Sequence, residues 1–114
     1  MKQSAALVFA TLILLVLVAC AGDGKLTNEK AMTALKVVLP DCSVTVTGVQ
    51  EMPQENKAIA EFNYSKCRDK MTEGEPDGRG YGHFTHYNDG RWVLMEVGKK
   101  GYGPRYGPLN IEAK

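Results

Sequence analysis

The amino-acid sequence predicts an α+β domain in which one amphipathic helix packs on a four-stranded antiparallel meander sheet, in the order α-β-β-β-β. Two observations support this fold class. Residues 27–38 carry apolar side chains at helical spacing, whereas four later runs alternate apolar and polar side chains as half-buried strands do. Each layer must cover the apolar face of the other. We therefore expect a two-layer domain over residues 27–97, followed by a Gly/Pro/Tyr-rich tail at 98–114.

The expected helix begins at Thr27, which can cap its first backbone N–H groups, and ends before Pro40. Polar residues fill the face away from one apolar stripe. A helix of about three turns is not stable alone, so the stripe must pack on the sheet. The stripe consists of Ala31, Ala34, Leu35, Val38 and Leu39.

The first expected hairpin joins a run at 42–49 to a run at 57–64 through a turn at 53–56. Pairing Val46 with Phe62 places Thr47 opposite Glu61. The side chains that share the expected inner face are Val44, Val46, Ala58, Ala60, Phe62 and Tyr64.

Residues 68–80 read as a loop, and a second hairpin follows, with strands at 81–87 and 91–97. Asp89-Gly90 is typical of a two-residue type I′ turn. That turn sets a register in which Phe84 faces Met95, His86 faces Val93, Tyr87 faces Trp92 and His83 faces Glu96. In this register the core face carries Phe84, Val93, Met95 and Val97, whereas the open face carries Tyr87, Trp92, Leu94 and Thr85.

The first 20 residues resemble a bacterial lipoprotein signal. One positive charge at Lys2 precedes an apolar run of about 15 residues, shorter than the roughly 20 that a membrane-spanning helix needs. The run ends in Leu17-Val18-Ala19-Cys20, which is similar to the lipobox. The resemblance implies removal of residues 1–19, acylation of Cys20, and a tether at 20–26 that leads to the domain.

A lipid bilayer, reached through acylated Cys20, is then the first expected partner. Ala21 after the cysteine resembles the signal for the periplasmic face of the outer membrane, because Asp at that position is the residue that retains a lipoprotein in the inner membrane. Two alternatives stay open: ordinary signal cleavage near an incidental Cys20 thiol, and an uncleaved anchor helix.

Lipid on Cys20 would leave Cys42 and Cys67, and the envelope is an oxidising compartment, so we expect a disulfide between them. Their positions on the first hairpin fall on opposite faces, and a bulge or a strand end must redirect one of them. Their spacing is not that of a redox C-x-x-C motif.

Composition argues for a small binding module of near-neutral charge. The chain has a formal net charge of +1, and Lys2 lies in the segment expected to be removed, so a nucleic-acid partner is not expected. No Gly-rich phosphate loop or Ser-His-Asp arrangement stands out, and we expect neither an enzyme nor a cofactor. We expect no metal: His83 and His86 fall on opposite strand faces, and the acidic residues 73–77 lack calcium-loop spacing.

Aromatic residues with a polar group are the candidates for recognition, because they are enriched in binding surfaces. The alternative is that the tail folds over them as a second small core. The expected binding surface is made of Tyr81, Tyr87, Trp92, Tyr102 and Tyr106.

The element order over residues 27–97 resembles the cystatin-like and NTF2-like α+β architectures, and residues 84–94 are similar to the last hairpin of small envelope proteins of this layout. The resemblance implies a fold and no activity. The leading hypothesis is therefore an envelope lipoprotein that binds a protein or small ligand through its open sheet face and tail. The alternative is a small-ligand or catalytic pocket in an NTF2-like cone between helix and sheet, with His86 and Tyr64 as its polar groups.

Overall fold

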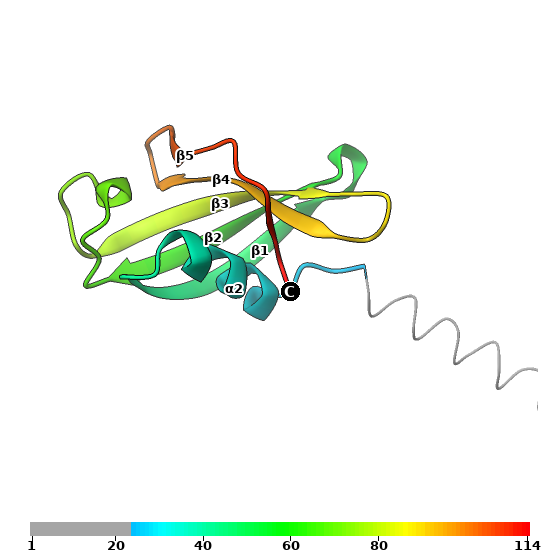
Figure 1. Ribbon diagram of the computed structural model, residues 1–114. Helices are drawn as coiled ribbons and strands as arrows, with labels where there is room; N and C mark the ends of the chain where they lie inside the picture. The colour runs from blue at the N-terminus through cyan, green and yellow to red at the C-terminus, as the bar shows by residue number, and fades with distance from the viewer. Residues whose placement is uncertain (1–23) are drawn as a thin grey trace, which may run out of the picture.

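The computed structural model describes residues 24–114, and the predictions for the signal segment, Cys20 and Ala21 lie outside the described residues. One helix and one antiparallel sheet form the domain (Figure 1), so the expected α+β class is confirmed. The sheet has six strands instead of four. The elements are α2 (Asn28–Val38), β1 (Ser43–Met52), the 3-10 turn η1 (Pro53–Glu55), β2 (Lys57–Ser65), the 3-10 turn η2 (Lys70–Thr72), β3 (Gly78–His86), β4 (Trp92–Lys99), β5 (Pro104–Tyr106) and β6 (Ile111–Glu112).

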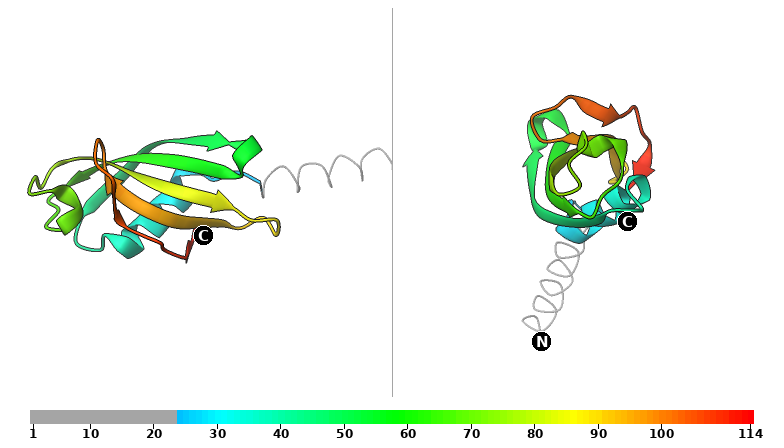
Figure 2. Two further views of the ribbon diagram at one scale, coloured as in Figure 1. Left: turned by 90° about the horizontal axis from the view of Figure 1, so that it is seen from above. Right: turned by 90° about the vertical axis from the view of Figure 1, so that its left-hand side faces the viewer.

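Helix α2 begins where its sequence predicts, because the Thr27 hydroxyl accepts a hydrogen bond from the Lys30 N–H at 3.2 Å. Its apolar stripe faces the sheet, with Ala31, Ala34 and Leu35 fully buried. The helix contacts β1 at one side of the sheet and β4 and β6 at the other. The end-on view in Figure 2 shows the reason: the sheet curls into a ring, and the helix lies in the gap between its two sides.

The expected pairing of Val46 with Phe62 is confirmed, but the register shifts one residue later. A β-bulge at Thr47 places Gly48 opposite Glu61, so the expected Thr47–Glu61 pairing is wrong. The Thr47 hydroxyl instead donates to the Glu61 carbonyl at 3.2 Å. Beyond the bulge, pairing continues to Met52 and extends β1 past the expected end at residue 49.

Strand β3 starts at Gly78, within the segment 68–80 that the sequence predicts to be a loop. Gly78 pairs with Tyr64 and Gly80 pairs with Phe62. A Cβ atom at Gly80 would lie 2.4 Å from the Phe62 ring, and one at Gly78 would lie 2.6 Å from the Tyr64 hydroxyl. These glycines therefore belong to a strand, and the Phe62 and Tyr64 rings of β2 lie over them. In the sequence alone, a glycine-rich strand of this kind looks the same as a loop.

The second hairpin has a three-residue loop at 88–90, not the expected two-residue turn. The Tyr87 N–H donates to the Arg91 carbonyl at 2.9 Å, and Gly90 adopts a left-handed φ of 93°. Such a turn followed by a left-handed glycine is the common three-residue solution. Phe84 consequently pairs with Leu94 instead of Met95.

The shifted register reverses the predicted faces of β4. His86 pairs with Trp92 and Thr85 with Val93, so Trp92 and Leu94 join the main core. Val93 is buried as predicted, at 1% exposed, but lies outside that cluster, and Met95 is half-buried. A second bulge between His83 and Phe84 restores the expected His83–Glu96 pairing. This bulge also returns Val97 to the core face, as predicted.

The tail supplies the two additional strands. Tyr106 of β5 pairs with Val97, and Ile111 of β6 pairs with Leu94, so both strands extend the β4 side of the sheet. The tail is therefore part of the domain and does not fold over an open face as a second core. In Figure 2 the segment between β4 and β6, in orange, lies outside the ring of strands. Within residues 24–114 no helix is long and apolar enough to cross a membrane.

Candidate functional site

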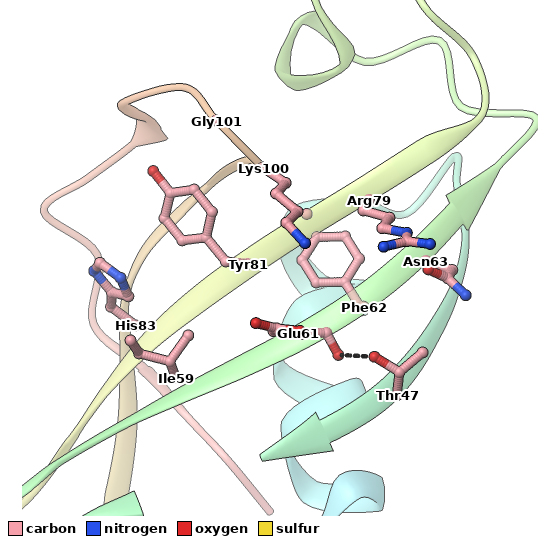
Figure 3. A pocket seen from close by; sticks show the side chains of 11 residues that line it. Thr47, Ile59, Glu61, Phe62, Asn63, Arg79, Tyr81, His83, Lys100 and Gly101 are labelled. Carbon is pink, nitrogen blue, oxygen red and sulfur yellow. Dashed lines mark hydrogen bonds between the residues drawn. The ribbon is translucent and has the colours of Figure 1, made fainter. Parts of the chain in front are cut away.

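A trough on the outer face of the sheet is the main concave feature of the domain. It consists of two hollows of about 470 Å³ and 490 Å³ that share Ile59 and His83 as lining residues. Strands β2 and β3 form its floor, on the face opposite α2. Figure 3 shows the first hollow, with Ile59 and His83 at one end and Arg79 and Asn63 at the other.

The floor follows from strand alternation. Ala58, Ala60 and Phe62 of β2 point into the core and are buried, so the residues between them point outward. Strand β3 does the same, with Gly80, Gly82 and Phe84 inward. The outward side chains of the two strands that line the trough are Lys57, Ile59, Glu61, Asn63, Arg79, Tyr81, His83 and Thr85.

One wall of the trough belongs to the tail. Residues 100–101 line the first hollow and residues 107–108 the second. The Tyr81 hydroxyl donates to the Tyr102 carbonyl at 2.7 Å and joins this wall to the floor. Gly98 is required beneath that contact, because a Cβ atom there would lie 2.5 Å from the Tyr81 hydroxyl. Burial raises the pKa of Tyr81, and the nearby Glu96 carboxylate adds to the rise.

The first hollow carries two cations, Arg79 and Lys100, that form no ion pair within 4.0 Å with any residue of the described part of the chain. Glu61 is the one acidic residue that lines the same hollow, so the lining has a positive balance. Figure 3 shows Arg79, Lys100 and Glu61 among the side chains that line this hollow.

The second hollow is mainly apolar. Met52, Met95 and Pro108 line it, together with Ala58 and Phe84 from the floor. Lys57, Glu96 and His83 also line it, and the His83 Nδ1 and Glu96 Oε1 atoms lie 3.3 Å apart. The His83 ring also packs on Tyr81, with ring centroids 5.0 Å apart. The first hollow thus carries Arg79, Lys100 and Glu61, whereas the second has more apolar side chains and includes Lys57 and Glu96 at its margin.

The five aromatic residues predicted as one binding surface do not form one. Tyr81 lines the trough, and Tyr102 is 50% exposed on its tail wall. Tyr87 is 40% exposed at the hairpin loop, where the Arg91 guanidinium lies 5.5 Å from its ring centroid. Trp92 is 4% exposed and stacks on His86 at 4.3 Å, so its placement on an open face is wrong. Tyr106 is half-buried against Asp69.

The expected disulfide between Cys42 and Cys67 is confirmed. Both cysteines lie just beyond the ends of β1 and β2, after the terminal pair Ser43–Ser65. Lys66, between β2 and Cys67, has a left-handed φ of 51°. This turn at the strand end redirects Cys67 toward Cys42 and resolves the mismatch of faces.

Two acidic residues of the β2–β3 connection, Glu75 and Asp77, have partners within the protein. Glu75 pairs with Lys99 at 2.6 Å, and Asp77 accepts the Lys66 N–H at 3.0 Å. The hydrogen bond from Lys99 lowers the pKa of Glu75, and the same bond raises the pKa of Lys99. In the described part of the chain, no group of three or more His, Cys, Asp or Glu residues is placed to hold a metal ion.

Ile59, Arg79 and Lys100 line the trough but are not among the site residues predicted from the sequence. The alternation of β2 already places Ile59 on the outer face, but Arg79 fell within an expected loop and Lys100 within a tail of undefined position. Comparison of the chain with models of known protein families, with curated proteins and with solved structures found no match.

Proposed function

We propose that this protein is a lipid-anchored, non-enzymatic binding module of the bacterial envelope, and that the outer-face trough is its binding site. The trough is the observation that carries the proposal: two adjoining hollows of ligand size, lined largely by outward side chains that take no part in the core cluster. The lipobox-like Leu17-Val18-Ala19-Cys20 supports the anchor.

The lining of the trough favours binding over catalysis. It includes neither serine nor cysteine as a nucleophile, and the Thr47 hydroxyl at its rim is engaged with the Glu61 carbonyl. The alternative pocket, in a cone between helix and sheet, has less support because that interior is filled by buried side chains. Leu35, Phe62, Phe84 and Leu94 are all at most 1% exposed.

An anchor at Cys20 would keep the trough close to the membrane. Leu26 is 4% exposed and is the first core residue of the domain, six positions after Cys20. At up to ~3.5 Å per extended residue, the domain would start within about 20 Å of the lipid. The segment leading to α2 enters near the β3–β4 hairpin, so this end of the sheet would face the membrane (Figure 1).

The anchor is tested by expressing the full chain in bacteria and measuring the mass of the protein recovered from membranes. We expect cleavage before Cys20 and added acyl chains on it, and Cys20→Ala should leave the membrane fraction. The matched control, Cys42→Ala/Cys67→Ala, removes the other two cysteines and should stay in membranes. An unacylated Cys20, or a Cys20→Ala variant that is still membrane-bound, would overturn the anchor.

A further inference from the structure

We infer that the trough binds a single-chain amphiphile with a carboxylate head group, a ligand of the fatty-acid class. This inference rests on the proposed binding site and adds the chemistry of its occupant. The observation behind it is the difference between the two hollows: Arg79 and Lys100 line the first, and Met52, Met95 and Pro108 line the second.

The head group is assigned by charge complementarity. Arg79 and Lys100 line the same hollow, and neither has an anionic partner among the described residues. A guanidinium presents two parallel N–H donors that match a carboxylate, and a lysine ammonium adds a point charge. With Glu61 as the one carboxylate lining this hollow, a single anionic head would bring the local charge close to neutral.

The apolar chain is assigned by the far hollow. Methionine side chains are flexible and polarisable, so Met52 and Met95 can adjust to a hydrocarbon chain of variable shape. Ile59 and His83 line both hollows and so lie where they meet, and Tyr81 adds aromatic surface in the first. From Asn63 to Lys57 the floor spans roughly 20 Å at about 3.3 Å per strand residue, long enough for an extended chain with its head at one end.

A peptide fits this floor less well than a hydrocarbon chain does. Strand β2 is hydrogen-bonded to β1 and β3, and β3 to β2 and β4, so the floor's backbone groups are already paired. A peptide laid across the face of a sheet would lose water from its own N–H and C=O groups without gaining these partners. A hydrocarbon chain carries no such groups.

The test is photo-crosslinking of the full-length, membrane-bound protein with a dodecanoate that carries a diazirine at its terminal carbon. We expect labelling at residues 52, 95 and 107–108, and competition by unlabelled dodecanoate. Arg79→Gln/Lys100→Gln should lower the labelling about tenfold or more, since a hydrogen bond to a charged group contributes about 1.5–3 kcal/mol. The matched control, Arg68→Gln/Arg105→Gln, removes two exposed cations that do not line either hollow and should label like the wild type.

Two further probes test the wild-type chain without any substitution. A dodecylamine diazirine, with the same chain and a cationic head, should label the trough at least several-fold less, and acetate should not compete. Equal labelling of the trough by both heads would overturn the carboxylate assignment and leave the binding site standing. Labelling spread over the surface, or no labelling of the trough with either probe, would overturn the binding site as well. The anchor is tested independently, because the acylation of Cys20 is measured by mass spectrometry.

Discussion

The phenol oxygen of Tyr106 lies 2.8 Å from both carboxylate oxygens of Asp69, 37 residues earlier in the chain. The same carboxylate accepts the Met71 N–H at 2.8 Å and so caps η2. The Lys70 ammonium lies 4.9 Å from the centroid of the Tyr106 ring. One aspartate therefore ties the β2–β3 connection to β5, and this tie holds the tail that walls the trough.

Replacement of Tyr106 by phenylalanine tests this tie. Burial and the hydrogen bond to Asp69 raise the pKa of Tyr106 from 10.0 to about 12. The folded state favours the protonated phenol. The phenol's contribution to the free energy of unfolding is therefore complete below pH 10 and is lost as the pH rises toward 12. Tyr106→Phe should lower the free energy of unfolding at pH 7 by about 1–2 kcal/mol.

Urea unfolding at pH 8 and pH 11.5 measures both effects. Wild-type protein should lose more stability over this interval than Tyr106→Phe does. Tyr64 and Tyr81, whose pKa values are also raised by burial, remain in both proteins and cancel in the comparison. Equal losses in the two proteins would show that the Tyr106 phenol does not carry the pH dependence.

Removal of the disulfide should destabilise the domain strongly. Cys42 and Cys67 close a loop with a sequence separation of 25. The chain-entropy estimate for that loop is about 3–4 kcal/mol, a large part of the stability of a small domain. Thermal unfolding of Cys42→Ser/Cys67→Ser should match that of reduced wild-type protein. A double variant as stable as the oxidised wild type would contradict this expectation.

Gly80→Ala should destabilise the sheet by about 1–3 kcal/mol through overpacking. The new Cβ would lie 2.4 Å from the Phe62 ring and 3.0 Å from the Gly98 carbonyl, and a backbone carbonyl cannot rotate away. Gly103→Ala is the matched control, because nothing lies within 4 Å of its added Cβ. Similar denaturant midpoints for the two variants would argue against the close packing of Phe62 on β3.

Leu35→Ala should cost about 2–5 kcal/mol, because the side chain is fully buried between α2 and the sheet. Val37→Ala, two residues away on the same helix, is the control. Val37 is 62% exposed, so the free energy of unfolding of this variant should be close to that of the wild type. Chemical unfolding of both variants checks the orientation of the helix. A larger loss for Val37→Ala would mean that the other face of α2 is the packed one.

Local patterns predicted the elements whose neighbours lie close in sequence. The apolar spacing and the Thr27 cap gave the helix, and the alternation of residues 57–64 gave β2 and its inward face. The disulfide was predicted from the cysteine count and the proposed envelope location, because lipid on Cys20 would leave only Cys42 and Cys67 to pair. In each case the deciding interaction is local or compositional.

The errors arose where tertiary packing selected among locally similar alternatives. Asn88-Asp89-Gly90 suits either a two-residue or a three-residue loop, and the three-residue loop brought Trp92 and Leu94 into the main core cluster. Likewise, a Gly-rich run suits either a loop or a strand, and the Phe62 and Tyr64 rings made it a strand.

The sequence by itself therefore determined the α+β class, the helix, the first pairing and the disulfide. The tertiary structure decided the loop register, the bulges, the two tail strands and hence the trough. The physical reason is that a one-residue shift reverses every side chain of a strand, and such a shift depends on packing energies summed over distant neighbours. The trough depends on that sum most of all, since Arg79 and Lys100 come together only after β3 has started early and the tail has joined β4.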